Sequence, residues 1–147
     1  MTPTVDTASF HDLIAVLANE RRTLEELLFR HAEISMLIAA GEHRFVGRAI
    51  DEALDVESRL AAGELMRAIA VAEVYGDDAT LAQVLAAAPA DAAEHLARLA
   101  DDMARLVSEV ERYRREASAW AGERAGKLRE AIDRFGSEFY SAERVGS

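Results

Sequence analysis

Apolar residues recur at helical spacing, three or four residues apart, along most of the chain. The first such run begins after Asp6 or Thr7, either of which can cap a helix with a side-chain oxygen, and it ends at Gly41. Glu20 and His31 are the polar interruptions of its stripe. The apolar members are Phe10, Leu13, Leu17, Leu24, Leu27, Ile34 and Ile38. We expect a long amphipathic helix whose apolar face packs in a bundle.

A second long helix is predicted from about residue 42 to residue 74. Its less regular apolar stripe consists of Val46, Ile50, Leu54, Leu60, Leu65 and Ile69. Because only a tight link separates the two helices, they are expected to lie antiparallel as a hairpin over residues 6–75.

Residues 76–90 are predicted to be a connector. Gly76 ends the second helix, and Asp78 can cap a short helix that runs to about Ala87. Pro89 then forces a boundary, because proline disfavours helical geometry at the residue before it.

The last helix is predicted over residues 91–140, followed by a flexible end at 141–147. Asp91 and Glu94 stand at capping-box spacing at its start. A regular heptad follows: Leu96, Leu99, Met103, Leu106, Val110, Tyr113, Ala117 and Trp120. Beyond Trp120 the apolar stripe moves by one position, and the shift falls on Gly122 and Gly126, which weaken a helix.

Two alternatives follow for the segment after this shift. The helix either bends at the glycines and folds back on the bundle, or it extends as a weakly held amphipathic segment that binds a partner. In the second case the partner-binding candidates are Tyr113, Ala117, Trp120, Leu128, Ile132, Phe135 and Phe139. Taken alone, Trp120 favours core packing over a partner contact. In both cases the pattern predicts an all-α fold, an antiparallel bundle of long helices in one domain over residues 1–140.

Charge and composition exclude several classes of partner. The 147 residues carry a formal net charge of -10, so the chain repels phosphate backbones and anionic membranes, and no nucleic-acid partner is expected. There is no cysteine, and no apolar run approaches the 18 or so residues of a membrane span. The N-terminus lacks the basic flank of a signal peptide. We therefore expect a cytoplasmic protein without membrane insertion.

No catalytic, metal or cofactor site is expected. The sequence has no phosphate-binding loop, dinucleotide fingerprint, zinc-protease motif or nucleophile elbow. None of its histidines has the Glu-x-x-His spacing of a di-metal bundle. His31 is expected to pair with a Glu or a carbonyl. Glu20 either sets the helix register or lies near a bundle end, and the second is favoured. Arg112, Arg114 and Arg115 could bind an acidic partner, but a mixed-charge, solvated face is favoured because Glu109, Glu111 and Glu116 surround them.

A resemblance to a known family spans residues 27–76 and extends through 78–89 into the last helix. The residues that carry it are Leu27, Leu28 and Phe29, then Leu37, Ala39, Ala40 and Gly41, then His43, Arg44 and Phe45, then Ala70, Val71, Ala72 and Glu73. In this order and spacing the chain resembles the FlgN-type flagellar export chaperones of high-GC Gram-positive bacteria. It departs from that family in the last helix, which lacks the Asn-Arg-x-Leu-Leu run.

The resemblance implies a cytoplasmic, non-enzymatic chaperone of flagellar type III secretion. Such proteins bind the helical termini of hook-filament junction proteins and deliver them to export apparatus components. The C-terminal helical region, roughly residues 110–139 here, would be the main substrate contact, and a homodimer is compatible with it. The alternative function is a generic helical-bundle adaptor or a self-associating coiled-coil scaffold.

Overall fold

The protein is helical throughout its described part. The computed structural model describes the backbone of residues 7–145 and the side chains of residues 9–123 and of Asp133. This part contains four α-helices: α1 Thr7–Ala39, α2 Val46–Tyr75, α3 Leu81–Ala87 and α4 Ala90–Val145. A 3-10 turn, His43–Phe45, joins α1 to α2. The prediction of an all-α fold built from a long hairpin, a short connector helix and a long last helix is confirmed.

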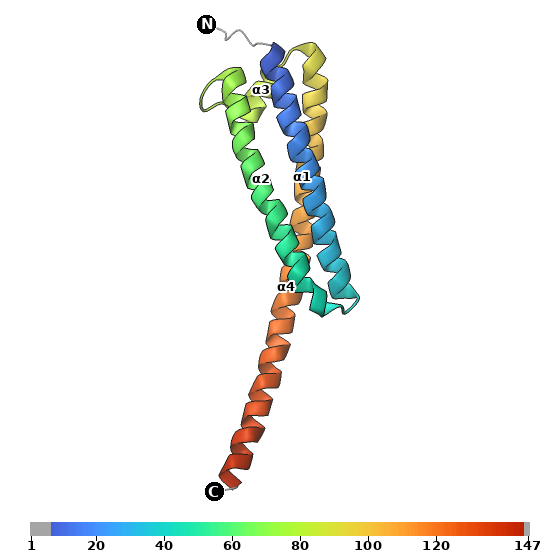
Figure 1. Cartoon of the computed structure of the whole chain (residues 1–147), viewed down its shortest axis with the longest axis vertical. Coiled ribbons are helices and arrows are strands. Elements are labelled where there is room, and N and C mark those ends of the chain that lie inside the picture. The colour runs from blue at the N-terminus through green and yellow to red at the C-terminus, as the bar shows by residue number, and fades with distance from the viewer. Residues whose placement is uncertain (1–6, 146–147) are drawn as a thin grey trace.

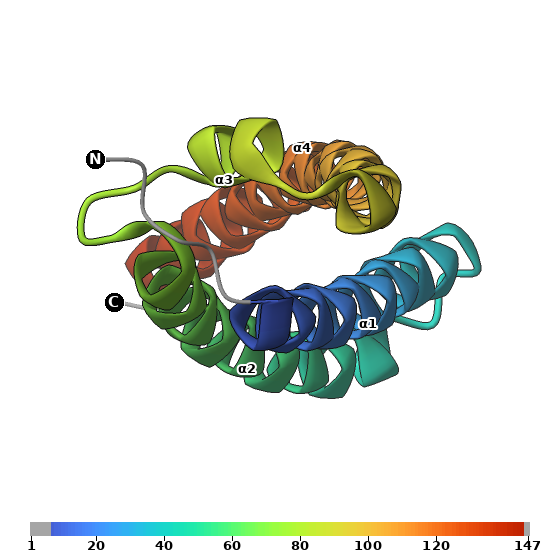
Figure 2. The ribbon, with the colours of Figure 1, turned by 90° about the horizontal axis from the view of Figure 1, so that it is seen from above.

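Helix α1 lies at the centre and packs against both α2 and α4 (Figure 1). Within the described residues, no Cα atom of α2 comes within 8 Å of a Cα atom of α4. The short α3 contacts both of these helices at one end of the bundle, with Val84 fully buried (Figure 2). The bundle therefore has three long helices of which two, α2 and α4, keep their backbones apart from each other.

The predicted stripes of α1 and α4 form most of the core. In α1 all members of the stripe are buried except Ile38, which is half-buried. The buried members in α4 are Leu96, Leu99, Met103, Leu106 and Val110. The next three, Tyr113, Ala117 and Trp120, are half-buried. Burial thus fades along α4 as the helix approaches the free end of the hairpin.

The predicted stripe of α2 is wrong. Ile50, Leu54, Leu65 and Ile69 are exposed, Leu60 is half-buried, and only Val46 lies in the core. The buried face is instead made of Val46, Ala49, Ala53, Val56, Ala70, Val71 and Val74. Small side chains let α2 approach α1 closely, and the larger residues are left on an outer face.

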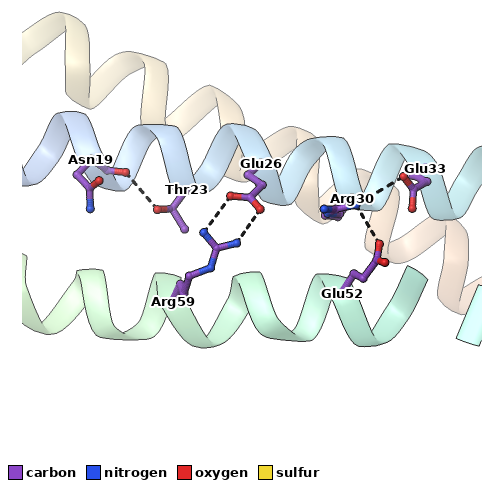
Figure 3. A network of polar contacts seen from close by, with 7 residues as sticks. All are labelled: Asn19, Thr23, Glu26, Arg30, Glu33, Glu52 and Arg59. Atoms are coloured by element: carbon purple, nitrogen blue, oxygen red, sulfur yellow. Dashed lines mark hydrogen bonds and ion pairs between the residues drawn. The ribbon is translucent and has the colours of Figure 1, made fainter. Parts of the chain in front are cut away.

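Charged side chains fix the register of α1 against α2 on the exposed side of this contact (Figure 3). Arg59 donates two hydrogen bonds to the carboxylate of Glu26, at 3.0 and 2.6 Å. Arg30 donates to Glu52 at 2.9 Å and lies 3.7 Å from Glu33. The Arg59–Glu26 pair is exposed and sets orientation more than stability, whereas the pairs of Arg30 are partly buried.

The connector begins differently from the prediction. Thr80, not Asp78, caps α3: its hydroxyl accepts from the Gln83 amide at 3.2 Å, and the Gln83 side chain accepts from the Thr80 amide at 2.9 Å. Asp78 instead adopts a left-handed backbone with φ 63° in the loop. An Asp tolerates that geometry better than most residues do, which explains its place in a turn.

Helix α4 does not bend at the glycines. It continues without a break to Val145, five residues beyond the predicted end at 140, and runs past the free end of the hairpin (Figure 1). We call residues 121–145 the tail. Of the two alternatives for this segment, the structure shows the extended one. The side chains of Leu128, Ile132, Phe135 and Phe139 lie outside the described residues.

Candidate helix-binding groove

An apolar groove runs between α2 and α4, with α1 as its floor. The groove exists because the backbones of α2 and α4 stay apart from each other beyond α3. Two cavities lie in it. Both are lined by residues of α1, α2 and α4 together. We call this feature the α2–α4 groove.

The cavity at the free end of the hairpin has a volume of about 240 Å³. Its floor is formed by His31, Ile34 and Ile38 of α1. Ile50 and Leu54 line it from α2 although both are exposed, Leu54 to 52%. The remaining lining residues are Val46, Ala53, Glu57, Arg114, Ala117, Ser118, Trp120 and Ala121. Its size and lining suit one or two large apolar side chains of a partner.

The second cavity, of about 300 Å³, lies nearer α3. Glu20 and Leu24 form its floor. The walls are Leu60, Glu64 and Arg67 of α2, Leu81 of α3, and Ala100, Met103, Ala104 and Val107 of α4. Alanine on the α4 side makes this part of the groove wide, and Val107 is 42% exposed there.

A polar cluster joins the three helices between the two cavities. Arg114 of α4 lies 3.1 Å from the Glu57 carboxylate of α2, and His31 Nε2 of α1 lies 3.6 Å from the same Oε1 atom. Burial lowers the pKa of His31, Glu57 opposes that shift, and Arg114 reinforces it. As expected, His31 lies beside a glutamate, although its Nε2 atom makes no hydrogen bond at this distance. Arg114 is 55% exposed, as the predicted solvated face requires, and it also reaches across the groove to Glu57.

Glu20 carries a buried carboxylate into the groove. Its residue is 3% exposed, and Oε1 accepts a 2.8 Å hydrogen bond from Arg67, whereas the buried Oε2 has no hydrogen-bond partner. Burial raises the pKa of Glu20, and Arg67 lowers it in part. The expectation that Glu20 lies near a bundle end is therefore wrong: it sits in the middle of α1, where Arg67 offsets its charge.

Three of the predicted partner-binding residues have described side chains. Ala117 and Trp120 line the cavity at the free end of the hairpin, and the Trp120 ring lies 5.2 Å from the His43 ring. The Arg112 guanidinium lies over the Tyr113 ring, with its Cζ atom 4.9 Å from the ring centre. The structure thus brings Ala117 and Trp120 into the groove, whereas Leu128, Ile132, Phe135 and Phe139 belong to the tail outside the described side chains.

Sequence reasoning missed the α2 wall. Leu54 and Leu65, the latter 64% exposed, were expected in the core. A signal was present in the alanine and valine positions of α2, which keep a helical spacing of their own on a different face. Two apolar faces on one helix indicate one packed partner and one surface that is open.

Other kinds of site are not found in the described part of the chain. It contains no group of three or more His, Cys, Asp or Glu side chains placed to hold a metal ion. No helix among the described residues is long and apolar enough to cross a membrane. No protein-family model, curated protein or solved structure matches the chain.

Proposed function

We propose that the protein is a chaperone that covers an amphipathic helix of a client protein before the client is exported. The observation that carries this proposal is the α2–α4 groove: it is long, apolar and lined by three helices, and the tail of α4 projects from its end. A surface of this form binds the apolar face of a helix through residues spaced three and four apart.

The exposed residues support a protein partner. Ile50 and Leu54 of α2 leave large apolar side chains in water at the cavity near the free end of the hairpin, and Val107 of α4 does so at the second cavity. Large apolar residues exposed around a cavity are typical of interaction sites. Helix-in-groove binding shields the client residues that would otherwise aggregate.

The resemblance to FlgN-type proteins supports the client class. It rests on the Leu27–Phe29 run, the segment 37–45 and the Ala70–Glu73 run. From it we infer a cytoplasmic, non-enzymatic role in flagellar type III secretion, with hook-filament junction proteins as clients and export apparatus components as later partners. In this account the client helix contacts the groove and the tail together.

The test is a capture experiment with two forms of the chain. The full-length protein and a version that ends at Ser118 are incubated with lysate of the source cells, and captured proteins are identified by mass spectrometry. Among the residues whose side chains the structure describes, the shorter form keeps every buried core residue, since the last of these is Val110. Capture of hook-filament junction proteins by the full-length form alone supports the proposal. Equal capture by both forms, or by neither, contradicts it.

A matched pair of groove variants locates the contact. Leu54→Glu places a charge in the mouth of the cavity at the free end of the hairpin, whereas Ser58→Glu places one on an exposed position one turn further along α2. The groove account predicts loss of client capture with Leu54→Glu only. If the two variants capture clients equally well, the groove is not the client site.

A further inference from the structure

The α4 helix carries a second stripe that runs beside its core stripe. The core stripe is the heptad from Leu96 to Trp120. One position after each of its members from Leu99 on lies a residue that lines the groove or its outer rim: Ala100, Ala104, Val107, Glu111, Arg114, Ser118 and Ala121. These seven residues, spaced alternately by four and three, are the groove stripe. Continued along the unbroken helix, the same spacing reaches residues 125, 128, 132, 135 and 139, which are Ala, Leu, Ile, Phe and Phe.

This continuity explains the shift of the apolar pattern after Trp120. The tail stripe, Leu128 to Phe139, continues the groove stripe with larger apolar residues, and the core stripe continues as Arg124, Lys127, Ala131, Arg134 and Glu138. One side of α4 therefore presents alanine, valine and serine together with Glu111 and Arg114 where α1 and α2 flank it, and large apolar residues where it stands alone. An amphipathic helix that stands alone exposes its apolar stripe to water, so a partner surface would stabilise the tail.

We propose that a second copy of this chain supplies that surface: two α4 helices pair antiparallel through this stripe, and the tail of each fills the α2–α4 groove of the other. With Ala121 opposite Ser118 of the second copy, the whole stripe comes into register. Phe139 then lies opposite Ala100 of the second copy, Phe135 opposite its Ala104, and Ile132 opposite its Val107. At the outer end of the stripe large residues of the tail meet small ones of the groove, whereas Leu128 and Ala125 lie opposite the long side chains of Glu111 and Arg114.

The lengths of tail and groove agree with this arrangement. The groove runs from Ala121 to Ala100, where Leu81 of α3 closes it. The large apolar residues of the tail end at Phe139, the position that meets Ala100 of the second copy. The tail cannot enter its own groove, because the continuous helix leads away from it (Figure 1).

Charges also match. The groove contributes the buried Glu20, with one oxygen unpartnered, together with Glu57 and Glu64. In an antiparallel pair, the tail positions that continue the core stripe turn toward the α1 floor of the second copy. These positions hold Arg124, Lys127, Ala131, Arg134 and Glu138, three cations and one anion. In the proposed register, residue 134 is level with the cavity that Glu20 lines.

The surface buried is sufficient for a stable dimer. Aromatic side chains bury roughly 150–250 Å² each, so the four phenylalanines of two tails bury roughly 600–1,000 Å². The leucine and isoleucine of each tail and the groove walls that they cover bring the total above the roughly 1,200 Å² of specific interfaces. A client helix would displace the tail of the second copy from the groove and would then contact the freed tail as well, so the form that ends at Ser118 loses both the dimer and the tail contact with the client. The dimer is nevertheless independent of the proposed function, because its test uses the purified protein alone.

The test exchanges the small side chain at position 104 and the large one at position 135, which face each other in the proposed dimer. Light scattering or sedimentation gives the mass of the wild-type protein, which should be twice that of one chain. Ala104→Phe and Phe135→Ala, each made alone, should weaken the dimer by at least about tenfold, because each change occurs twice across the two-fold axis. The double variant should restore the dimer. Ala119→Phe, an exposed alanine away from the stripe, is the control, and circular dichroism verifies that every variant is folded.

A cross-link gives the direction of pairing. The chain has no cysteine, so Ala104→Cys and Phe135→Cys introduce the only thiols. Mixed together, the two variants should form a disulfide dimer, while each alone should not, because the two 104 positions of an antiparallel pair stand about 45 Å apart. A monomeric wild type, a dimer unaffected by Ala104→Phe, or cross-linking of each variant with itself would overturn the proposal.

Discussion

Glu20 of α1 and Arg67 of α2 form a 2.8 Å ion pair around a carboxylate that is almost fully buried. Arg67→Ala removes the cation that offsets the charge of Glu20 and leaves this carboxyl group in a desolvated site. We expect a loss of about 1–3 kcal/mol in the free energy of unfolding, toward the lower end because Arg67 is a third exposed. Glu20→Gln in the same background should restore part of that loss. Urea titration measures both values.

The pH dependence of Glu20 has a definite sign. Burial raises its pKa above 4.5, so the folded chain holds this proton to a higher pH than the unfolded chain does. The stability that this group adds is present below pH 4.5 and is lost as the pH rises through the folded pKa. Glu20→Gln should flatten this part of the stability curve. An unchanged curve would mean that Glu20 titrates as a solvated carboxylate.

Arg59→Ala is the matched control for Arg67→Ala. Arg59 also pairs with a glutamate of α1, Glu26, at even shorter distance, but both side chains are well exposed. Solvent replaces such a pair when it is lost. The thermal midpoint should therefore fall clearly less for Arg59→Ala than for Arg67→Ala.

His31 should make the bundle less stable in mild acid. Burial lowers its pKa below 6.5 although Glu57 acts in the opposite direction. The unfolded chain therefore takes up a proton as the pH falls through 6.5, and the folded chain does so only at lower pH. Stability is complete above pH 6.5 and is lost below it. His31→Gln should remove this loss when thermal midpoints at pH 5.5 and pH 7.5 are compared.

A buried leucine of the core and an exposed leucine of α2 should respond differently to truncation. Leu99 is fully buried, and Leu65 is 64% exposed. Leu99→Ala should cost about 2–5 kcal/mol of unfolding free energy. Leu65→Ala should leave that free energy nearly unchanged, which chemical denaturation of both variants measures. A large loss at Leu65 would place the outer face of α2 in a packed interface of the purified protein.

Trp120 and Phe135 should matter for binding more than for folding. Trp120 is half-buried at the edge of the cavity at the free end of the hairpin, and Phe135 is a tail residue. Trp120→Ala together with Phe135→Ala should abolish partner capture with little loss of helicity, because large aromatic side chains dominate interfaces. Capture that persists despite a clear drop in the thermal midpoint would instead assign both side chains to the core.

The sequence predicts the helices of this fold better than their faces. In α1 the large apolar residues and the buried face coincide, so the stripe from Phe10 to Ile34 is right. In α2 they do not, because alanine and valine pack against α1 while Leu54 and Leu65 stay outside. Size alone cannot distinguish a core from a docking surface. Likewise, the pairing of Glu20 with Arg67 joins residues 47 apart, and such a contact has no local signal.

Part of the candidate site could be predicted and part could not. The heptad of α4 identifies Ala117 and Trp120, which line the groove, and the register shift at Gly122 indicates a change of partner. The groove itself arises from the separation of α2 and α4, a tertiary property that no single helix encodes. The sequence pattern of α4 and the fold are both needed to show that the tail stripe continues the groove-lining residues of α4.

Site-specific photo-crosslinking from position 104 tests most directly whether a helix occupies the groove. A photoreactive amino acid replaces Ala104 on the groove stripe or, as control, the exposed Ala119 on the opposite side of α4. In cells that express each variant, we predict adducts from position 104 with the terminal helical segment of a hook-filament junction protein or with the tail of a second copy. We predict neither adduct from position 119. No adduct from position 104, or the same adducts from both positions, would contradict the account.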